Sequence, residues 1–335
     1  MRKVVITPGE TGINVLHIRE ITPRPLNPNE VRIRVRAASV NYKDILTVKR
    51  GIGQELIPLS DGAGTVEEVG SAVTRLKPGD RVIGLFFPLW QCGTIDSTKF
   101  SSVRGSVPTD GMLSQMVWGH EDGFVKFPEY LSYEEAATLP CAGVTAWNAL
   151  VVQGHLKPGE TLVILGTGGV ALFGLQLAKM IGARVIILSS SDEKLQRARQ
   201  MGADELINYR LNPDWEKQVL EKTAQVGADL ILELGGLGTL ARSMASAKIN
   251  GRISMVGVLT GTEGQVDPMP ILRKTLSVNG IYVGSRDMQI QLHQALEANK
   301  IHPVIDRLFT LDKVREAYET MQSGKHFGKI VIQLD

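Results

Sequence analysis

Residues 163–174, VILGTGGVALFG, constrain the fold more than any other stretch of the chain. Residues 163–165 are apolar and branched, as in a buried strand, and apolar positions at helical spacing resume from residue 170. The turn between them follows the pattern G-x-G-x-x-G/A, with Gly166, Gly168 and Ala171 at the small positions. Such a turn bends at the first glycine, admits a pyrophosphate to backbone N–H groups at the second, and packs a helix closely at the third. The segment therefore predicts a strand, a phosphate-binding turn and a helix.

The glycine turn has two possible interpretations, a dinucleotide site or a tight turn that binds no ligand. The sequence that follows the turn distinguishes between them. Most of the apolar runs that follow are continuous rather than alternating, which is typical of strands covered on both faces. Gly182, Gly202 and Gly227 each follow a helical segment, where a left-handed cap favours glycine. The runs lie at 183–188, 205–209, 228–234, 252–258 and 279–284, with helical segments at 192–201 and 213–226. This order predicts an α/β fold with a doubly wound parallel sheet, whose first turn is the glycine motif.

Composition narrows the class of protein. The 335 residues suggest two domains, and a hydrophobic content of 43% is enough for sizeable cores. A net charge of +2 argues against nucleic acid or a membrane surface as partner. Cys92 and Cys141 are too few for a disulfide framework, so we expect a cytoplasmic location. The motifs C-x-x-C, H-E-x-x-H and G-x-S-x-G do not occur, which removes support for structural zinc and for a serine hydrolase.

The remaining sequence predicts a β-rich, barrel-like domain. Strand-like runs lie at 3–7, 31–40 and 81–87, with turn sequences such as LNPNE and LKPGD between strand-like pieces. Residues 132–151 are helical in pattern and are expected to bridge two domains. After two further helices, residues 327–334 form a last strand that has no place in the dinucleotide sheet. We therefore expect this strand to return to the first domain.

Seven motifs together resemble the medium-chain dehydrogenase/reductase superfamily, in its zinc-free branch of quinone-oxidoreductase-like and alcohol-dehydrogenase-like enzymes. They are VNYKDIL, PLSDGAG, LKPGDRV, YEEAATLPCAGVTAWNAL, GTGGVALFGLQLAK, LSSSDEKLQRARQMGAD and HFGKIVI, in order along essentially the whole chain. The resemblance implies a GroES-like catalytic domain from residues 1–141 and 285–335, and a Rossmann domain from residues 142–284. It also implies a nicotinamide cofactor, and a homodimer joined through the edge strand near 279–284.

The resemblance also bears on metal binding. Aligned with zinc-dependent members, Asn41 stands in the place of a cysteine ligand, Ser60 in that of a histidine, and Asp61 in that of a neighbouring acid. Cys141 alone keeps the position of a ligand, and its more ordinary role is that of a small buried side chain. Because a catalytic zinc needs three protein ligands, we expect no metal.

Without a Lewis acid, the favoured substrates are those that delocalise the developing negative charge. The sequence therefore predicts an NADPH-dependent reductase that transfers hydride to a quinone or an activated alkene. Two alternatives remain open: a metal-free carbonyl reductase or alcohol dehydrogenase, and an NADPH-binding protein with little turnover. The partner is in each case a small molecule.

Asn41, Tyr42, Lys43 and Asp61 are the candidate catalytic residues, since relatives turn this stretch toward the nicotinamide. Tyr42 or Lys43 is a candidate proton donor, or either one orients the substrate or the ribose. The simpler alternative is a solvated lysine and a packed tyrosine. Residues 88–112 form either a rim of the substrate site or a plain surface loop.

Candidate cofactor contacts follow from the rule that ligands bind at the carboxyl ends of parallel strands. The glycine turn contributes Gly166, Gly168, Gly169 and Val170, and later strand ends contribute Leu234, Gly235, Val256, Gly257, Val258, Val283, Gly284 and Ser285. Thr145, Phe327, Gly328 and Lys329 are added by the resemblance.

The end of the second strand indicates which nicotinamide cofactor binds. An NAD site generally has an acid here for the ribose 2′-hydroxyl, but this chain has Ser189, followed by Ser190 and Ser191. The hydroxyls and a helix N-terminus favour a 2′-phosphate, with Lys194 adding positive charge and Tyr209 flanking the adenosine. The competing explanation is a capping box between Ser190 and Glu193, which needs no ligand. We therefore predict NADPH.

Overall fold

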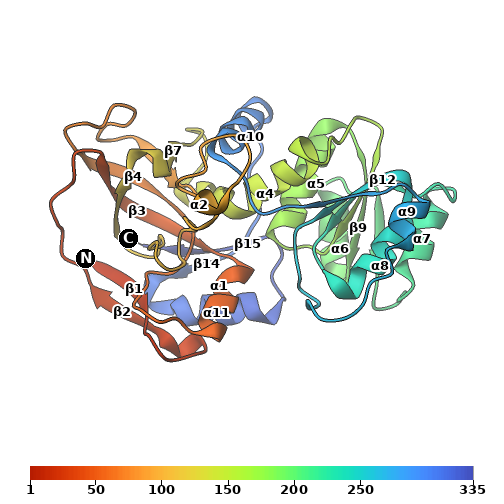
Figure 1. The fold of residues 1–335 in the computed structure, drawn as a ribbon, viewed down its shortest axis with the longest axis horizontal. Helices are drawn as coiled ribbons and strands as arrows, with labels where there is room; N and C mark the ends of the chain where they lie inside the picture. Colours follow the sequence, from red (N-terminus) through yellow and green to blue (C-terminus); the bar gives the residue numbers. More distant parts are fainter. Residues whose placement is uncertain (335) are drawn as a thin grey trace. The chain divides into compact units, whose positions relative to one another are not determined.

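The computed structural model describes residues 1–334, which fall into two compact units (Figure 1). The terminal unit is Met1–Val144 with Gly284–Asp335, and the central unit is Thr145–Val283. These divisions lie within three residues of the domain limits expected from the sequence.

The sheet of the central unit has six strands, and every neighbouring pair is parallel. In chain order the strands are β8 (Thr161–Leu165), β9 (Arg184–Ser189), β10 (Glu205–Asn208), β11 (Ala228–Glu233), β12 (Ala247–Met255) and β13 (Ser277–Gly280). Their spatial order is β10-β9-β8-β11-β12-β13. This is the 3-2-1-4-5-6 order of a dinucleotide-binding Rossmann sheet, so the predicted fold class is confirmed.

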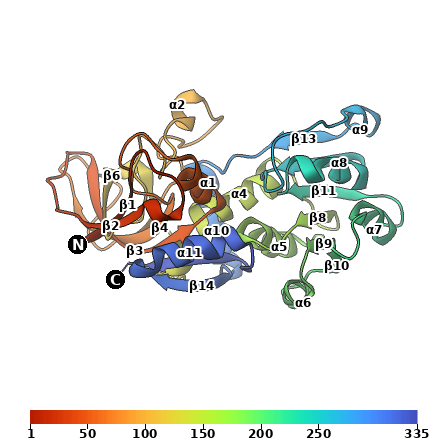
Figure 2. The same cartoon turned by 90° about the horizontal axis from the view of Figure 1, so that it is seen from below.

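Helices cover both faces of this sheet (Figure 2). They are α5 (Gly169–Ile181), α6 (Asp192–Gln200), α7 (Trp215–Lys222), α8 (Leu237–Ser246) and α9 (Met269–Arg273). Helices α5 and α6 lie on one face, while α7 and α8 pack against each other on the opposite face. Because the middle of the sheet is covered on both sides, β8, β9 and β11 are mostly apolar and buried, as the continuous apolar runs predict, whereas β12 and the edge strand β13 include exposed polar residues.

Two details of the central unit differ from the expectation. The sixth strand ends at Gly280, so residues 281–284 of the predicted run are outside the sheet. Helix α7 ends at Lys222 and not before Gly227, because Ala224 and Gln225 have left-handed backbone conformations, with φ of +50° and +66°. Gly227 instead lies where a Cβ would come within 2.7 Å of the Lys248 backbone N, so close packing of the chain requires glycine there.

The terminal unit is built around a largely antiparallel sheet of seven strands. Along the chain they are β3 (Glu30–Val40), β4 (Asp61–Val69), β5 (Arg81–Gly84), β6 (Met116–His120), β7 (Phe124–Lys126), β14 (Ile305–Thr310) and β15 (Lys329–Gln333), and β1 (Arg2–Ile6) pairs separately with β2 (Leu16–Glu20). Strand β15 pairs with β3, with Ile330 opposite Val40. The last strand therefore returns to the first domain, as predicted.

Strand β3 shows why this sheet forms. Its alternate residues Val31, Ile33 and Val35 are fully buried in the core, while the arginines between them face outward. Arg32 and Arg34 both pair with Glu67 on β4. The alternation is that of a strand with one apolar and one polar face.

The helices of the terminal unit are α1 (Tyr42–Arg50), α2 (Ser97–Phe100), α3 (Tyr133–Ala136), α10 (Arg286–Asn299) and α11 (Val314–Ser323). The predicted helical stretch 132–151 is not one α-helix: α3 is followed by a π-helical turn at Leu139–Gly143, by α4 (Val144–Trp147) and by a second π-helical turn at Asn148–Val152. The boundary between the two units falls inside this stretch. Within residues 1–334, no helix combines the length and apolarity needed to cross a bilayer.

Candidate cofactor and active site

The glycine turn has the geometry of a phosphate-binding turn. Gly166 has φ +91° and donates its N–H to the Leu188 carbonyl, which fastens the turn to the neighbouring strand. Helix α5 begins at Gly169, and its N-cap, Gly168, supplies no capping side chain. Ala171 is fully buried, as expected for a small packing position. The first N–H groups of α5 therefore lack a side-chain acceptor and suit an anion.

The serines after β9 are arranged differently from the capping box that we considered. The N-cap of α6 is Ser191, whose Oγ accepts from the Lys194 N–H at 3.4 Å. The capping box between Ser190 and Glu193 therefore does not form. Strand β9 continues through Ser189, and α6 begins at Asp192, one residue later than a cap at Ser190 requires. Ser189 is 4% exposed, and its Oγ accepts from the Ser191 N–H.

Strand pairing brings the predicted adenosine-side residues together. Ser189 lies opposite Asn208 in the sheet, and its carbonyl accepts from the Tyr209 N–H at 3.1 Å. The Asn208 side chain donates to the Asp192 carboxylate at 2.7 Å, so that acid is fixed beside the helix start. Tyr209 is 42% exposed, which leaves its ring free to cover a ligand.

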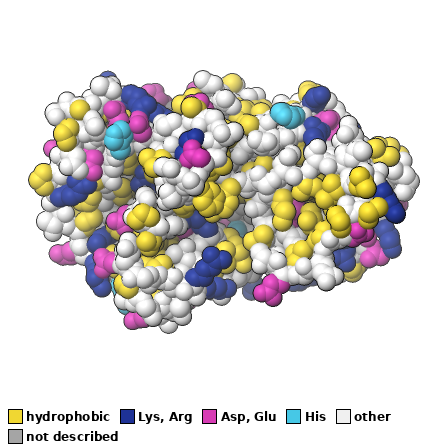
Figure 3. Space-filling model, viewed as in Figure 1, with side chains coloured by type: hydrophobic (Ala, Val, Ile, Leu, Met, Phe, Trp, Pro, Cys, Tyr) yellow, Lys and Arg dark blue, Asp and Glu magenta, His cyan; other side chains and the backbone are white. Residues whose placement is uncertain are grey.

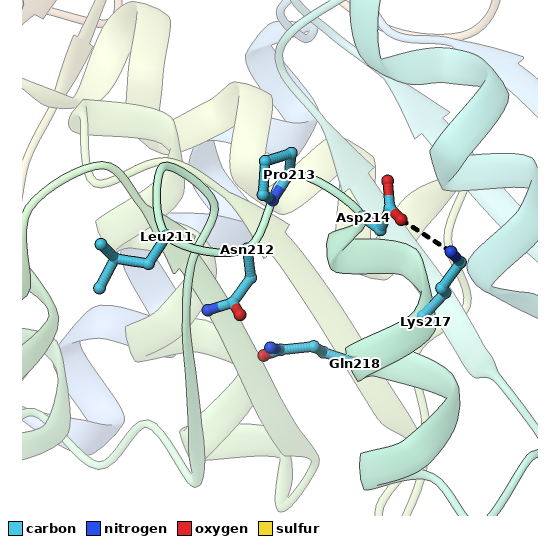
Figure 4. Close-up of a pocket in the computed structure, with 6 residues that line it drawn as sticks. All are labelled: Leu211, Asn212, Pro213, Asp214, Lys217 and Gln218. Atoms are coloured by element: carbon cyan, nitrogen blue, oxygen red, sulfur yellow. Dashed lines mark hydrogen bonds and ion pairs between the residues drawn. The ribbon is translucent and has the colours of Figure 1, made fainter.

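A hollow of about 380 Å³ lies just beyond this edge (Figure 4). It is lined by Leu211, Asn212, Pro213, Asp214, Lys217 and Gln218, and Asp214 pairs with Lys217 at one side of it. Asn212 donates through its backbone N–H and its side chain to the Asn208 carbonyl, so the loop is tied to β10. None of the predicted contacts lines this hollow, although Tyr209 is two residues from its wall.

The turns after β11 and β12 lie side by side. A Cβ on Gly257 would come within 2.2 Å of the Leu234 carbonyl oxygen, so this approach requires glycine. Leu234 and Gly235 follow β11, and Val256 and Val258 follow β12, which places these predicted contacts at one edge of the sheet.

The other predicted cofactor contacts fall in both units. Thr145 is buried in the central unit, where Asn148 donates to the Val283 carbonyl at 2.8 Å. Gly284, Ser285, Phe327, Gly328 and Lys329 belong to the terminal unit. There the Ser285 hydroxyl caps α10 by accepting from the Met288 N–H, and the Phe327 N–H donates to Asp306.

The terminal unit contains a buried polar cluster, which we define as Asn41, Asp44, Ser60, Asp61 and Lys329. The Lys329 ammonium donates to the Asn41 side-chain carbonyl and to the Val40 backbone carbonyl. It also lies 3.5 Å from the Asp61 carboxylate, which is fully buried and accepts from the Ser60 hydroxyl at 2.9 Å. The ammonium thus occupies the point where the oxygens of Asn41 and Asp61 converge.

Asn41 and Asp44 set the start of α1. They form a capping box, in which the Asn41 N–H donates to the Asp44 carboxylate at 2.8 Å. Burial raises the pKa of the Asp44 carboxyl, and the neighbouring Lys43 ammonium partly offsets this. The local sequence N-Y-K-D thereby orients the first turn of the helix.

The simpler alternative for this stretch is a solvated Lys43 and a packed Tyr42, and the structure shows neither. The Lys43 ammonium is held by the carbonyls of Arg104 and Gly105 at 3.1 and 3.4 Å, and it lies 3.5 Å from Asp44. Lys43 is thus a fixed lysine rather than a solvated one. Tyr42 is 37% exposed rather than packed.

The cluster does not fit a zinc ion. Oxygens of Asn41 and Asp61 already contact a buried ammonium, and the cluster offers an amide, a hydroxyl and two engaged carboxylates where zinc prefers thiolate and imidazole. Burial raises the pKa of the Cys141 thiol above its ordinary value, and nearby Asp61 raises it further, so the thiolate form that binds metals is disfavoured. In the described part of the chain, no group of three or more His, Cys, Asp or Glu side chains is arranged to hold a metal.

Residues 88–112 are irregular apart from the short helix α2. They are nevertheless anchored, because Phe87 contacts the rings of Trp90 and Phe100, and Arg104 is buried against the Phe124 ring. Since Lys43 binds the Arg104 carbonyl, this segment is tied to the start of α1.

Comparison with known proteins agrees with this architecture. Residues 169–298 match the family described as zinc-binding dehydrogenase, and residues 27–129 match the alcohol dehydrogenase GroES-like domain. A zinc-type alcohol dehydrogenase-like protein of Schizosaccharomyces pombe is 40% identical over 93% of each chain. The quinone oxidoreductase-like protein 2 of Bos taurus is 32% identical over 95% of this chain and 89% of its own. A solved NAD-dependent alcohol dehydrogenase is 29% identical, covers 100% of both chains and has a TM-score of 0.90.

The chain belongs to the medium-chain dehydrogenase/reductase superfamily of oxidoreductases, whose Rossmann-type members bind NAD(P). Two of the matched descriptions name zinc, yet the residues at the aligned ligand positions here do not fit that metal.

Proposed function

We propose that this protein is a zinc-independent, NADPH-dependent reductase that transfers hydride to a quinone or to an alkene conjugated with a carbonyl. The observation that carries the proposal is the Lys329 ammonium, which contacts Asn41 and Asp61 at the positions aligned with zinc-site residues. Without a metal to stabilise an alkoxide, a substrate that spreads the negative charge over a conjugated system reacts more readily.

The chain's own residues have distinct tasks in this reaction. A bound nicotinamide supplies hydride. The start of α5 binds the pyrophosphate, and the Tyr42 hydroxyl is the better candidate for donating a proton, because the Lys43 ammonium is already engaged by two backbone carbonyls. The buried cluster holds α1, and therefore Tyr42, in place.

A preference for NADPH is part of the proposal. It is supported by Ser189 at the end of β9, where an acid would repel a 2′-phosphate, and by the adjacent Ser190, Lys194 and Tyr209. One solved relative is described as NAD-dependent, so titration of this chain with NADPH and with NADH tests the proposed preference.

The proposal is tested by following cofactor oxidation with a panel of quinones, enals, enones and simple ketones. We expect turnover with NADPH and a conjugated acceptor, and no loss of activity after chelation. Turnover confined to simple ketones would indicate a carbonyl reductase. Cofactor binding without turnover would indicate a binding protein, and one tightly bound zinc per chain in metal analysis would overturn the zinc-independent mechanism.

Tyr42→Phe is expected to lower kcat for enone reduction about 100-fold while the Kd for NADPH stays unchanged, because general acid catalysis contributes about that factor. Lys43→Met is expected to lower the stability of the terminal unit by about 1–3 kcal/mol, since Arg104 and Gly105 lose a charged donor. Steady-state kinetics and urea unfolding measure the two effects. Tyr282→Phe, at another half-exposed tyrosine, is the control. Full activity in both variants would assign the proton to water.

A homodimer is also proposed, through the free edge of β13. Large apolar side chains are exposed on the central unit near this edge, and Figure 3 shows them gathered over β12 and α9. Ile249 and Leu272 are 71% and 72% exposed. An unpaired strand edge beside exposed apolar surface favours association with a second copy.

Ile249→Asp combined with Leu272→Asp is therefore expected to convert a dimer into a monomer in sedimentation velocity. Leu211→Asp is the matched control, because Leu211 is 70% exposed on the loop after β10, the opposite edge strand of the sheet. Equal sedimentation of all three proteins would contradict this interface.

A further inference from the structure

Glu233, the last residue of β11, is a fully buried acid that the sequence analysis did not select. Its Oε1 accepts from the backbone N–H groups of Gly235 and Gly236 at 2.7 and 3.0 Å and from the Thr239 hydroxyl at 2.6 Å. Its Oε2 accepts from the Ser243 hydroxyl. One carboxylate therefore binds the turn after β11 and two successive turns of α8, at Thr239 and Ser243.

The backbone of Glu233 binds a second turn. Its carbonyl accepts from the N–H groups of Val256 and Gly257 at 2.9 and 3.2 Å. Further along, the Thr260 N–H donates to the Gly235 carbonyl at 2.7 Å, and the Thr260 hydroxyl accepts from a backbone N–H of α8. We call residues 234–239 and 256–261 the turn pair, because these hydrogen bonds join them into one element.

The carboxylate also neutralises the positive end of α8. The N-cap of this helix is Gly236, which has no side chain to cap it, and the Glu233 Oε1 accepts from the Gly236 N–H. The next two N–H groups, of Leu237 and Gly238, donate to the Gly261 carbonyl and the Thr260 hydroxyl. At the opposite end, the Lys274 ammonium donates to the carbonyls of Met244, Ala245 and Ala247. A charged side chain of the protein thus lies at each end of α8, whereas the N-terminus of α5 has no side-chain cap.

We infer that Glu233 is a positioning residue of the cofactor site, acting as an internal anion that holds the turn pair in its binding conformation. The inference rests on the proposed dinucleotide cofactor, whose predicted contacts Leu234, Gly235, Val256, Gly257 and Val258 all lie on the turn pair. A turn that is already ordered costs no conformational entropy when the cofactor binds. Removing the carboxylate that orders the turn pair therefore weakens cofactor binding.

The test compares Glu233→Ala with Glu233→Gln by titration with NADPH, followed through nicotinamide fluorescence. Glu233→Ala is expected to raise the Kd at least 10-fold. Glu233→Gln is expected to stay within about threefold, because its amide carbonyl keeps the bonds of Oε1 and its NH2 donates to the Ser243 hydroxyl. Hydrogen exchange should speed up in both segments of the turn pair in Glu233→Ala, including the one that is distant in sequence.

Lys274→Met is the matched control, since it weakens the other end of α8 without touching the turn pair. We expect it to lower Tm and leave the Kd unchanged. If Glu233→Ala does not fold, Thr239→Val removes one donor and should raise the Kd about threefold. The inference is overturned if Glu233→Ala binds NADPH within twofold of the unmodified protein, or if Lys274→Met weakens binding equally. An unmodified protein that binds neither NADPH nor NADH would instead refute the proposed function.

Discussion

Lys329→Met is expected to lower the free energy of unfolding by about 3–5 kcal/mol, because it leaves the fully buried Asp61 carboxylate without a counter-charge. The Asn41 side-chain carbonyl loses its charged donor in the same variant. Urea unfolding followed by circular dichroism measures the loss.

Two companion variants show whether the buried pair is responsible. Adding Asp61→Asn to Lys329→Met removes the uncompensated charge and should recover at least about 1.5 kcal/mol of the loss. Lys222→Met breaks a half-exposed pair with Glu205 and should cost at most about 1 kcal/mol. If Lys329→Met costs no more than this surface control, or if the double variant shows no coupling, the buried ammonium does not have the role we assign to it.

Ser189→Asp is expected to weaken NADPH binding about 100-fold and to shift the preference toward NADH, which corresponds to about 2.7 kcal/mol. The new carboxylate repels a 2′-phosphate and accepts a hydrogen bond from a 2′-hydroxyl. Parallel titrations with the two cofactors give the ratio directly.

Ser189→Ala removes the hydroxyl without adding a charge, and it should weaken NADPH binding far less than Ser189→Asp without shifting the preference toward NADH. Lys194→Ala should weaken NADPH more than NADH, because it removes positive charge near the 2′ position. If the unmodified protein binds NADH as tightly as NADPH, the proposed preference is refuted, whatever the variants do.

The Rossmann sheet was predictable from the sequence because its signals are local. A glycine turn between an apolar run and a helix occupies twelve residues, and continuous apolar runs separated by helices imply parallel strands buried on both faces. The physical requirement at each of these positions, a bend, a close approach or burial, is met by the residue itself and its immediate neighbours.

Details that depend on where an element ends were predicted less well. The N-cap of α6 is Ser191 because pairing of β9 with β10 extends through Ser189, and sequence spacing alone does not reveal that pairing. In the same way, the role of Glu233 depends on its donors Thr239 and Ser243, which face it only once α8 has packed beside β11.

The two-part architecture and the phosphate-binding turn follow from local residue patterns, and the family resemblance adds that Asn41 and Ser60 stand at positions of the usual zinc ligands. The group that lies between Asn41 and Asp61 is visible only in the folded chain. Lys329 lies 288 positions from Asn41, and the two meet because the last strand, β15, pairs antiparallel with β3. That pairing carries an ammonium into a buried site, where it is stable only because Asp61 and two carbonyl oxygens surround it.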